Sequence, residues 1–173
     1  KRFSLLFRKR LWNEGEGKFM GWERKRGKLN ELNRLILGSE DTTFLHNVVD
    51  LAVLRSIKFV ITLDGDSQLP RGTARKLIGG LAHPLNRPLF DDKTNMVVKG
   101  YGIIQPRVGV ALTSANASPF SRIFSGHVGL DPYTSTISDV YQDLFDEGSF
   151  VGKAIYDVRA FERAMSGRVP ENA

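Results

Sequence analysis

The sequence predicts an α/β protein in which helices and strands alternate along the chain and build a sandwich on a largely parallel sheet. Two kinds of segment carry this prediction: runs with apolar residues at helical spacing, and short continuous apolar runs rich in β-branched residues. The chain has 173 residues and is 41% hydrophobic, which is enough for a folded domain with a substantial core. We therefore expect one globular unit.

The first half of the chain predicts two helices, a strand and a third helix. Residues 23–37 carry apolar side chains at helical spacing, and Gly38 is placed to end that helix. Residues 45–54 predict a second helix, and residues 57–63 predict a buried strand because they are short, continuous and β-branched. Pro70 at a first-turn position then opens a helix through Leu81.

The second half continues the alternation. Residues 96–98 and 102–110 predict two more strands, and residues 139–145 predict a helix. Residues 150–156 predict a strand, and residues 158–165 predict a last helix that Gly167 closes.

Composition excludes several kinds of site. The chain has no cysteine, so it forms neither disulfides nor thiolate metal sites, and His46, His83 and His127 lack metal-ligand spacing. Any metal must therefore bind to oxygen. No stretch approaches the roughly 18 consecutive apolar residues that cross a bilayer, and residues 1–8 have too short an apolar centre for a signal peptide, so we expect the chain itself to be soluble.

The formal net charge of +6 is concentrated in residues 1–28, whereas residues 131–147 are acidic. A basic segment suits nucleic acid, an anionic membrane surface or the phosphates of a nucleotide, and charge alone does not choose among them. A non-catalytic basic module is therefore one alternative. Its cations would be Arg8, Lys9, Arg10, Arg24, Lys25 and Arg26.

The most informative feature follows the strand predicted at residues 57–63. Asp64 and Asp66 are separated by one glycine in a polar turn that ends at Pro70. Because side chains alternate along an extended chain, both carboxylates point to the same side and can approach one hard divalent cation. The turn therefore predicts a metal site whose third partner is a pyrophosphate.

Three interpretations of this turn remain open from the residues. In a phosphohydrolase of the haloacid dehalogenase type, Asp64 would attack phosphorus and Asp66 would act as acid and base, although Gln68 stands where that motif has Thr or Val. In a glycosyltransferase of the GT-A type, both aspartates would hold Mg²⁺ or Mn²⁺ against the donor's two phosphates. Alternatively, the aspartates merely cap the helix expected at Pro70.

Several segments together resemble the glycosyltransferase domain of bacterial cyclic β-1,2-glucan synthases. They include GWERKRGKL at 21–29, ITLDGDSQLP at 61–70 and GYGIIQPR at 100–107. The remaining segments are residues 12–14, 82–88, 131–134, 139–145 and 147–150. This resemblance implies a partial GT-A fold, Rossmann-like with a mainly parallel sheet and flanking helices, of which residues 1–173 are the central part. It also implies that the first strands and the C-terminal catalytic segment are absent.

The resemblance implies an inverting glucosyltransferase that transfers glucose from UDP-glucose to a growing β-1,2-glucan, with Mg²⁺ or Mn²⁺ on Asp64 and Asp66. The implied partners are UDP-glucose, a β-glucan acceptor and the rest of a membrane-embedded parent chain at the cytoplasmic face of the bacterial inner membrane, without nucleic acid. We expect this fragment to lack turnover, and exposed strand edges to allow it to form a homodimer.

The resemblance also implies roles for individual residues. The donor phosphates and ribose would be held by Arg26, Lys28 and Asn30. The sugar of donor or acceptor would contact Gln105, Arg107, Tyr101 and Phe150. The catalytic general base is expected beyond Ala173, and we expect no such role for the acidic residues Asp139, Asp143 and Glu147 because their spacing fits the outer face of a helix.

Overall fold

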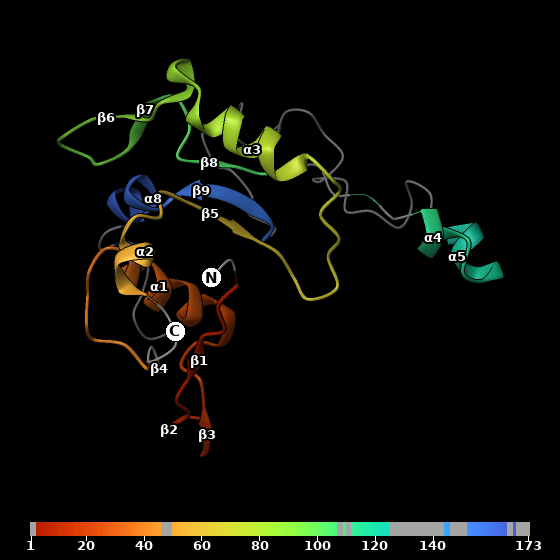
Figure 1. Cartoon of the computed structure of the whole chain (residues 1–173), viewed down its shortest axis with the longest axis horizontal. Coiled ribbons are helices and arrows are strands. Elements are labelled where there is room, and N and C mark those ends of the chain that lie inside the picture. Colours follow the sequence, from red (N-terminus) through yellow and green to blue (C-terminus); the bar gives the residue numbers. More distant parts are fainter. Residues whose placement is uncertain are drawn as a thin grey trace. The chain divides into compact units, whose positions relative to one another are not determined.

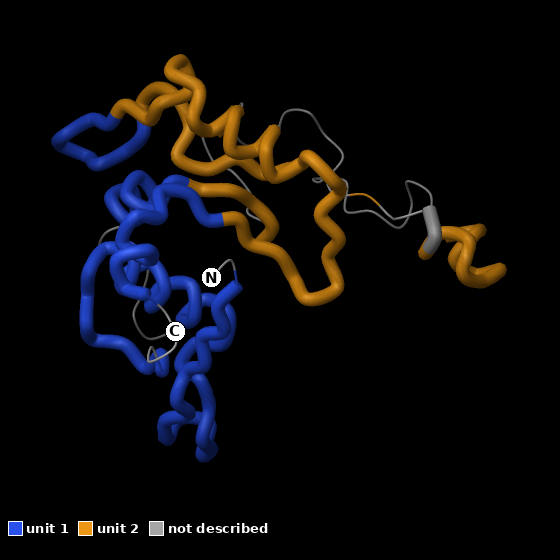
Figure 2. Tube along the Cα trace, in the orientation of Figure 1, with its two compact units in different colours: residues 1–60, 90–97, 157–173 blue, residues 61–89, 98–156 orange. Residues whose placement is uncertain are grey.

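A computed structural model gives the structure of the chain (Figure 1). It describes residues 3–45, 50–106, 109, 112–124, 144–145, 152–165 and 168. The chain divides into two compact units (Figure 2). Unit 1 comprises residues 1–60, 90–97 and 157–173, and unit 2 comprises residues 61–89 and 98–156.

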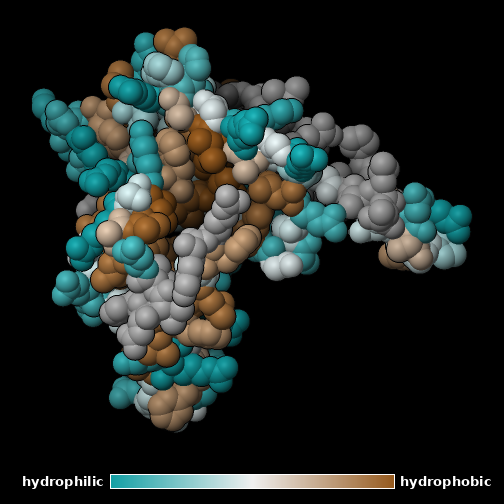
Figure 3. Space-filling model, viewed as in Figure 1, coloured by the Kyte–Doolittle hydropathy of each residue, from teal (hydrophilic) through white to brown (hydrophobic). Residues whose placement is uncertain are grey.

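Unit 1 begins with two small antiparallel pairs. Strand β1 (Phe7–Arg8) pairs with β4 (Phe44–Leu45). Strands β2 (Leu11–Asn13) and β3 (Lys18–Met20) form a hairpin in which Trp12 lies opposite Phe19, with ring centroids 5.2 Å apart. Both rings remain exposed, and the space-filling view shows apolar and hydrophilic residues side by side on this hairpin (Figure 3).

Three helices complete unit 1: α1 (Arg24–Ile36), α2 (Leu51–Arg55) and α8 (Val158–Met165). The core contains Leu35, Ile36, Phe44, Leu54, Val158 and Ala160. Buried Asn33 on α1 donates a hydrogen bond to Glu162 on α8 (2.8 Å), and Asp157 caps α8 by accepting from Ala160 N (3.1 Å). The hydrogen bond between Asn33 and Glu162 thus joins two helices that lie far apart in the sequence.

Unit 2 holds α3 (Thr73–Ala82), the short 3₁₀ helix η1 (Pro84–Asn86), strand β8 (Ile103–Ile104), and helices α4 (Leu112–Ala115) and α5 (Pro119–Phe124). Helix α3 lies along β8, and the position of a Cβ on Gly80 would be 3.7 Å from Ile104 (Figure 1). Four strands pass from one unit into the other: β5 (Phe59–Thr62), β6 (Leu89–Phe90), β7 (Val97–Lys99) and β9 (Ala154–Asp157).

The central sheet has the order β5-β9-β8. Strands β8 and β9 are antiparallel, with Ile103 opposite Tyr156 and Ile104 opposite Ile155. Lys58 O accepts from Val158 N in unit 1, and Thr62 is hydrogen-bonded to Ala154 in unit 2, so β9 also runs antiparallel to β5. Residues 154–156 of β9 are buried because strands flank them on both sides.

The α/β class predicted from the sequence is confirmed, but within the part of the chain that the structure describes the sheets are small and no largely parallel sheet is present. Among the described strands, the pairs whose direction the hydrogen bonds define are antiparallel. The alternation of helix and strand in a sequence indicates the type of each element and not which strands pair.

Most predicted elements are present with altered ends. The last helix is confirmed at both ends, and the helix at 23–37 and the strand at 57–63 are confirmed within two residues. The predicted start of α3 at Pro70 was wrong, since the helix begins at Thr73. Of the helix predicted at 139–145, residues 139–143 lie outside the described residues, and the hairpin β2–β3 was missed.

Candidate functional site

The acidic turn stands directly after β5, as the sequence predicted. Asp64 follows Thr62 by two residues, and its carbonyl accepts a hydrogen bond from Ser67 N (3.0 Å), which closes the turn. The Asp64 side chain is 37% exposed, and Asp66 is exposed. Helix α3 has Gly72 at its N-cap without a side-chain cap, so the aspartates do not serve as the cap that one interpretation assigned to them.

Lys153 is the partner of Asp64. Its Nζ lies 3.0 Å from Asp64 Oδ2, and its side chain is only 24% exposed. This pair was not predicted from the sequence, because Lys153 lies within the strand predicted at residues 150–156 and has no spacing relation to the acidic turn. The lysine places a positive charge beside the carboxylate that was predicted to hold a metal.

The position of Lys153 follows from the pairing of β5 with β9. Thr62 Oγ1 accepts a hydrogen bond from Ala154 N (3.2 Å) and donates one to Ala154 O (3.4 Å). Both residues are buried, so this reciprocal contact fixes the register of the two strands. Since Lys153 precedes Ala154 and Asp64 follows Thr62, the same register brings the two charged side chains together.

Gln105 lies at the same end of the sheet. It directly follows β8, and one further step of the β8–β9 register places it opposite Ala154, which lies opposite Thr62 on the other side. Gln105 is half-buried. The structure therefore brings this predicted sugar-binding residue to the end of the sheet that carries the acidic turn.

Tyr101 is held from its backbone. Tyr101 N donates to Asn86 O (3.0 Å), and Gly100 adopts a φ of +77° in which a Cβ would lie 2.1 Å from Arg87 O. Only glycine fits this close approach. The Tyr101 side chain itself is 54% exposed and so is accessible to a ligand. The other two predicted sugar contacts, Arg107 and Phe150, lie outside the described residues.

The acidic turn offers only part of a metal coordination shell. Among the residues that the structure describes, no group of three or more His, Cys, Asp or Glu side chains is arranged to hold a metal ion. Two carboxylates one residue apart fit the way Mg²⁺ is bound by proteins, where one or two carboxylates act together with substrate phosphates and water. The donor set is compatible with such an ion if a phosphate supplies further oxygens.

The predicted phosphate-binding residues all lie in unit 1, on α1. Successive residues of a helix are rotated by about 100°, so Arg26 and Asn30 share one face whereas Lys28 projects about 200° away from Arg26. Arg26 NH2 lies 3.1 Å from Glu23 Oε2, and Lys28 is exposed. The three residues are therefore not brought to one face of the helix.

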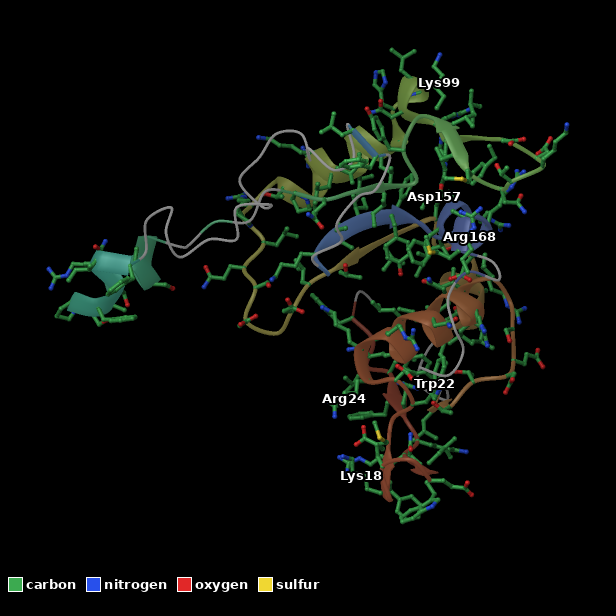
Figure 4. All side chains as sticks on the ribbon, turned by 180° about the vertical axis from the view of Figure 1, so that it is seen from behind. Lys18, Trp22, Arg24, Lys99, Asp157 and Arg168 are labelled. Atoms are coloured by element: carbon green, nitrogen blue, oxygen red, sulfur yellow. The ribbon has the colours of Figure 1, made fainter. Side chains whose placement is uncertain are left out.

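Close packing with Trp22 explains the glycine within this segment. A Cβ on Gly27 would lie 2.1 Å from Trp22 O and 2.6 Å from Trp22 Cε3, so a larger residue would collide with both backbone and ring. Glu23 and Arg24, which lead into α1, have left-handed φ values of 49° and 46°. Figure 4 labels Trp22 and Arg24 beside the start of α1. The beginning of this helix is thus shaped by the close contact between Trp22 and Gly27.

One cation assigned to the alternative basic module is already engaged within the fold. Arg8 NH2 lies 2.7 Å from Glu31 Oε1, with side-chain exposures of 8% and 11%. Burial raises the pKa of Glu31, but hydrogen bonds from Thr43 and Arg8 lower the pKa by more than burial raises it. The pKa of Glu31 therefore lies below its ordinary value. Arg8 is therefore not accessible for docking, which weakens the basic-module interpretation.

The described helices include none with the length and apolar character that a membrane span needs. Fold and site together define an α/β segment with an acidic turn at the end of a central strand, next to a lysine and a glutamine. No family model matches the chain.

The chain is similar to a segment of the cyclic β-(1,2)-glucan synthase NdvB of Rhizobium meliloti (strain 1021), with 53% identity over 99% of its own length. The aligned segment is 6% of that relative, so the chain spans only a small fraction of the protein it matches. The resemblance to these synthases is therefore confirmed for a segment of the synthase.

Proposed function

We propose that this chain is the part of a glucosyltransferase domain that holds the sugar-nucleotide donor. In this proposal the complete enzyme transfers glucose from UDP-glucose to a growing β-1,2-glucan with inversion at the anomeric carbon, and its domain has the GT-A fold. The proposal also includes the rest of a membrane-embedded chain as partner, at the cytoplasmic face of the inner membrane.

One observation carries the proposal: similarity to a cyclic β-(1,2)-glucan synthase extends over 99% of the chain, including the acidic turn after β5. The geometry of unit 2 is compatible with it. Asp64, Asp66 and Gln105 lie at one end of the β5-β9-β8 sheet, with carboxylates for a cation and an amide for sugar hydroxyls.

Each predicted residue has a role in this proposal. Asp64 and Asp66 hold Mg²⁺ or Mn²⁺, which when bound would neutralise charge on the departing nucleoside diphosphate. Gln105 hydrogen-bonds sugar hydroxyls, and Tyr101 offers an exposed ring to a sugar face. The remaining proposed contacts are Arg26, Lys28 and Asn30 for phosphates and ribose, and Arg107 and Phe150 for sugar. No residue of this chain is assigned as the general base.

Calorimetric titration of UDP into the intact protein, with and without Mn²⁺, tests the proposal. We expect binding that depends on Mn²⁺ and that falls at least about tenfold in Asp64→Asn and in Asp66→Asn. Lys76→Met, an exposed substitution on α3 in the same unit, is the control and should bind as the wild type does. Equal affinity in all four proteins would overturn the assignment of the acidic turn.

The phosphohydrolase alternative retains one supporting observation, because an ammonium group beside Asp64 would also suit attack of that carboxylate on phosphorus. The two reactions differ in what they release. The phosphohydrolase would release inorganic phosphate from simple phosphomonoesters, and Asp64→Asn would abolish that release. A glucosyltransferase would leave phosphomonoesters intact and would prefer a nucleoside diphosphate.

A further inference from the structure

The ion pair between Lys153 and Asp64 occupies the same carboxylate that the proposed function gives to the metal. Lys153 Nζ lies 3.0 Å from Asp64 Oδ2, which is within direct contact of the two charges. The reciprocal hydrogen bonds between Thr62 and Ala154 fix the register of both strands, so the pairing of the sheet brings Lys153 and Asp64 together.

The pair is partly shielded from water, which increases its effect on a second cation. The exposures of 24% for Lys153 and 37% for Asp64 place the two charges in surroundings where screening is weaker than in bulk water. A divalent cation that approaches Asp64 meets a carboxylate already neutralised and an ammonium that repels it. Asp66, exposed and two residues further on, does not by itself supply a metal site.

A diphosphate reverses this balance. Its negative charges attract the ammonium of Lys153 as well as the divalent cation, so the lysine can exchange the carboxylate for a phosphate oxygen while the cation takes the carboxylate. Neither exchange is favourable alone. Movement of Lys153 to a phosphate without a divalent cation would leave Asp64 without a cation, and binding of the divalent cation without a diphosphate would place two cations against Asp64.

We propose that Lys153 makes metal and diphosphate bind cooperatively: it competes with the divalent cation for Asp64 when no diphosphate is present and contacts the diphosphate when both are bound. This inference rests on the proposed function, since it assumes that the acidic turn binds a metal. Cooperative binding is reciprocal, so UDP must tighten Mn²⁺ by the same factor by which Mn²⁺ tightens UDP.

The test measures Mn²⁺ binding directly by electron paramagnetic resonance of the free ion, with the intact protein in the presence and absence of saturating UDP. For the wild type we expect weak binding of Mn²⁺ alone and binding at least about tenfold tighter with UDP. In Lys153→Met, Mn²⁺ alone should bind about tenfold tighter than in the wild type, and the effect of UDP should shrink by a similar factor.

Two further variants make the result specific. Lys153→Arg keeps the charge and should keep most of the cooperativity, whereas Lys76→Met removes a lysine elsewhere in unit 2 and should leave Mn²⁺ binding unchanged. Near-ultraviolet circular dichroism checks that each variant is folded.

The possible outcomes separate this inference from the proposed function. If Mn²⁺ binding in Lys153→Met matches the wild type both with and without UDP, the inference is overturned while the proposed function stands. If the variant loses UDP affinity but binds Mn²⁺ alone as the wild type does, Lys153 is a phosphate contact without competition, which also overturns it. If the folded wild type binds neither Mn²⁺ nor UDP, the proposed function itself fails.

Discussion

Two carboxylates of this chain are each paired with a cation, yet their surroundings differ. Glu31 in unit 1 is buried, and its two oxygens accept from Arg8 and from Thr42 and Thr43. Asp64 in unit 2 is more than a third exposed and faces Lys153 in a turn where Asp66 is also accessible.

The difference in exposure distinguishes the structural pair Arg8–Glu31 from the pair Lys153–Asp64, which is suited to binding a ligand. A buried carboxylate surrounded by donors has no capacity left for a ligand, and breaking its pair leaves an uncompensated charge. A half-exposed pair contributes little to stability, so its partner can be exchanged at small cost. The sequence does not reveal either pair, since Arg8 lies far from Glu31 along the chain and Lys153 lies far from Asp64.

The largest effect on stability is expected from Arg8→Met. Removal of the guanidinium leaves Glu31 buried with only its threonine donors, which should lower the free energy of opening of this region by about 3 kcal/mol. Hydrogen exchange of the Thr43 amide, which donates to Glu31 Oε2, measures the effect. Lys9→Met removes an exposed neighbouring cation and should cost less than about 0.5 kcal/mol. Similar losses in the two variants would contradict the structural role of the Arg8–Glu31 pair.

A smaller loss is expected where backbone packing supports the site in unit 2. In Gly100→Ala the new Cβ would lie 2.1 Å from Arg87 O at a positive φ, so we expect a loss of about 2 kcal/mol in the free energy of unfolding. Gly72→Ala has a similar φ of +83° but nothing within 4 Å, and should cost only about 1 kcal/mol. Urea unfolding followed by tyrosine fluorescence compares them, and equal losses would show that the contact with Arg87 is unimportant.

The buried carboxylate of Glu31 should make the stability of the protein depend on pH. Because the folded pKa of Glu31 lies below its ordinary value of 4.5, its contribution to stability is present above that value and is lost as the pH falls through the folded pKa. Thermal melting of the wild type and of Glu31→Gln between neutral pH and about pH 3 measures the contribution of ionised Glu31 to stability. The gap between the two melting temperatures should narrow at low pH, and a gap that is independent of pH would be inconsistent with an ionised Glu31.

The smallest effect on stability is expected at the acidic turn itself. Asp66→Asn should change the free energy of unfolding by less than about 0.5 kcal/mol, because Asp66 is exposed and does not cap α3. Asp64→Asn should cost less than about 1 kcal/mol, since its ion pair is partly solvated. A loss as large as that of Arg8→Met would show that the turn is structural, and would remove the contrast between the two carboxylates.

Much of the local structure was predictable from the sequence. The apolar spacing of residues 158–165 and of residues 23–37 gave the helices α8 and α1, because helix formation depends on a repeat read within one segment. The β-branched run at 57–63 gave β5 and placed Asp64 and Asp66 in a turn at its end. Resemblance to glucan synthases, carried by continuous segments, was confirmed by the similarity found over 99% of the chain.

The sequence was less informative about contacts between distant parts of the chain. A parallel sheet was expected, but the strand directions that the structure defines are antiparallel. Arg8 was counted among exposed cations, although Glu31 and Thr43 surround it in the fold.

By itself the sequence determined the helices α1 and α8, the strand β5 and the carboxylates of the acidic turn, because periodicity and motif spacing are properties of neighbouring residues. Only the tertiary structure decided which charges those carboxylates face. Thr62 and Ala154 are 92 residues apart, and their hydrogen bonds set the register that brings Lys153 to Asp64. Strand register is a long-range choice governed by burial and pairing across the whole sheet, so no local pattern encodes it.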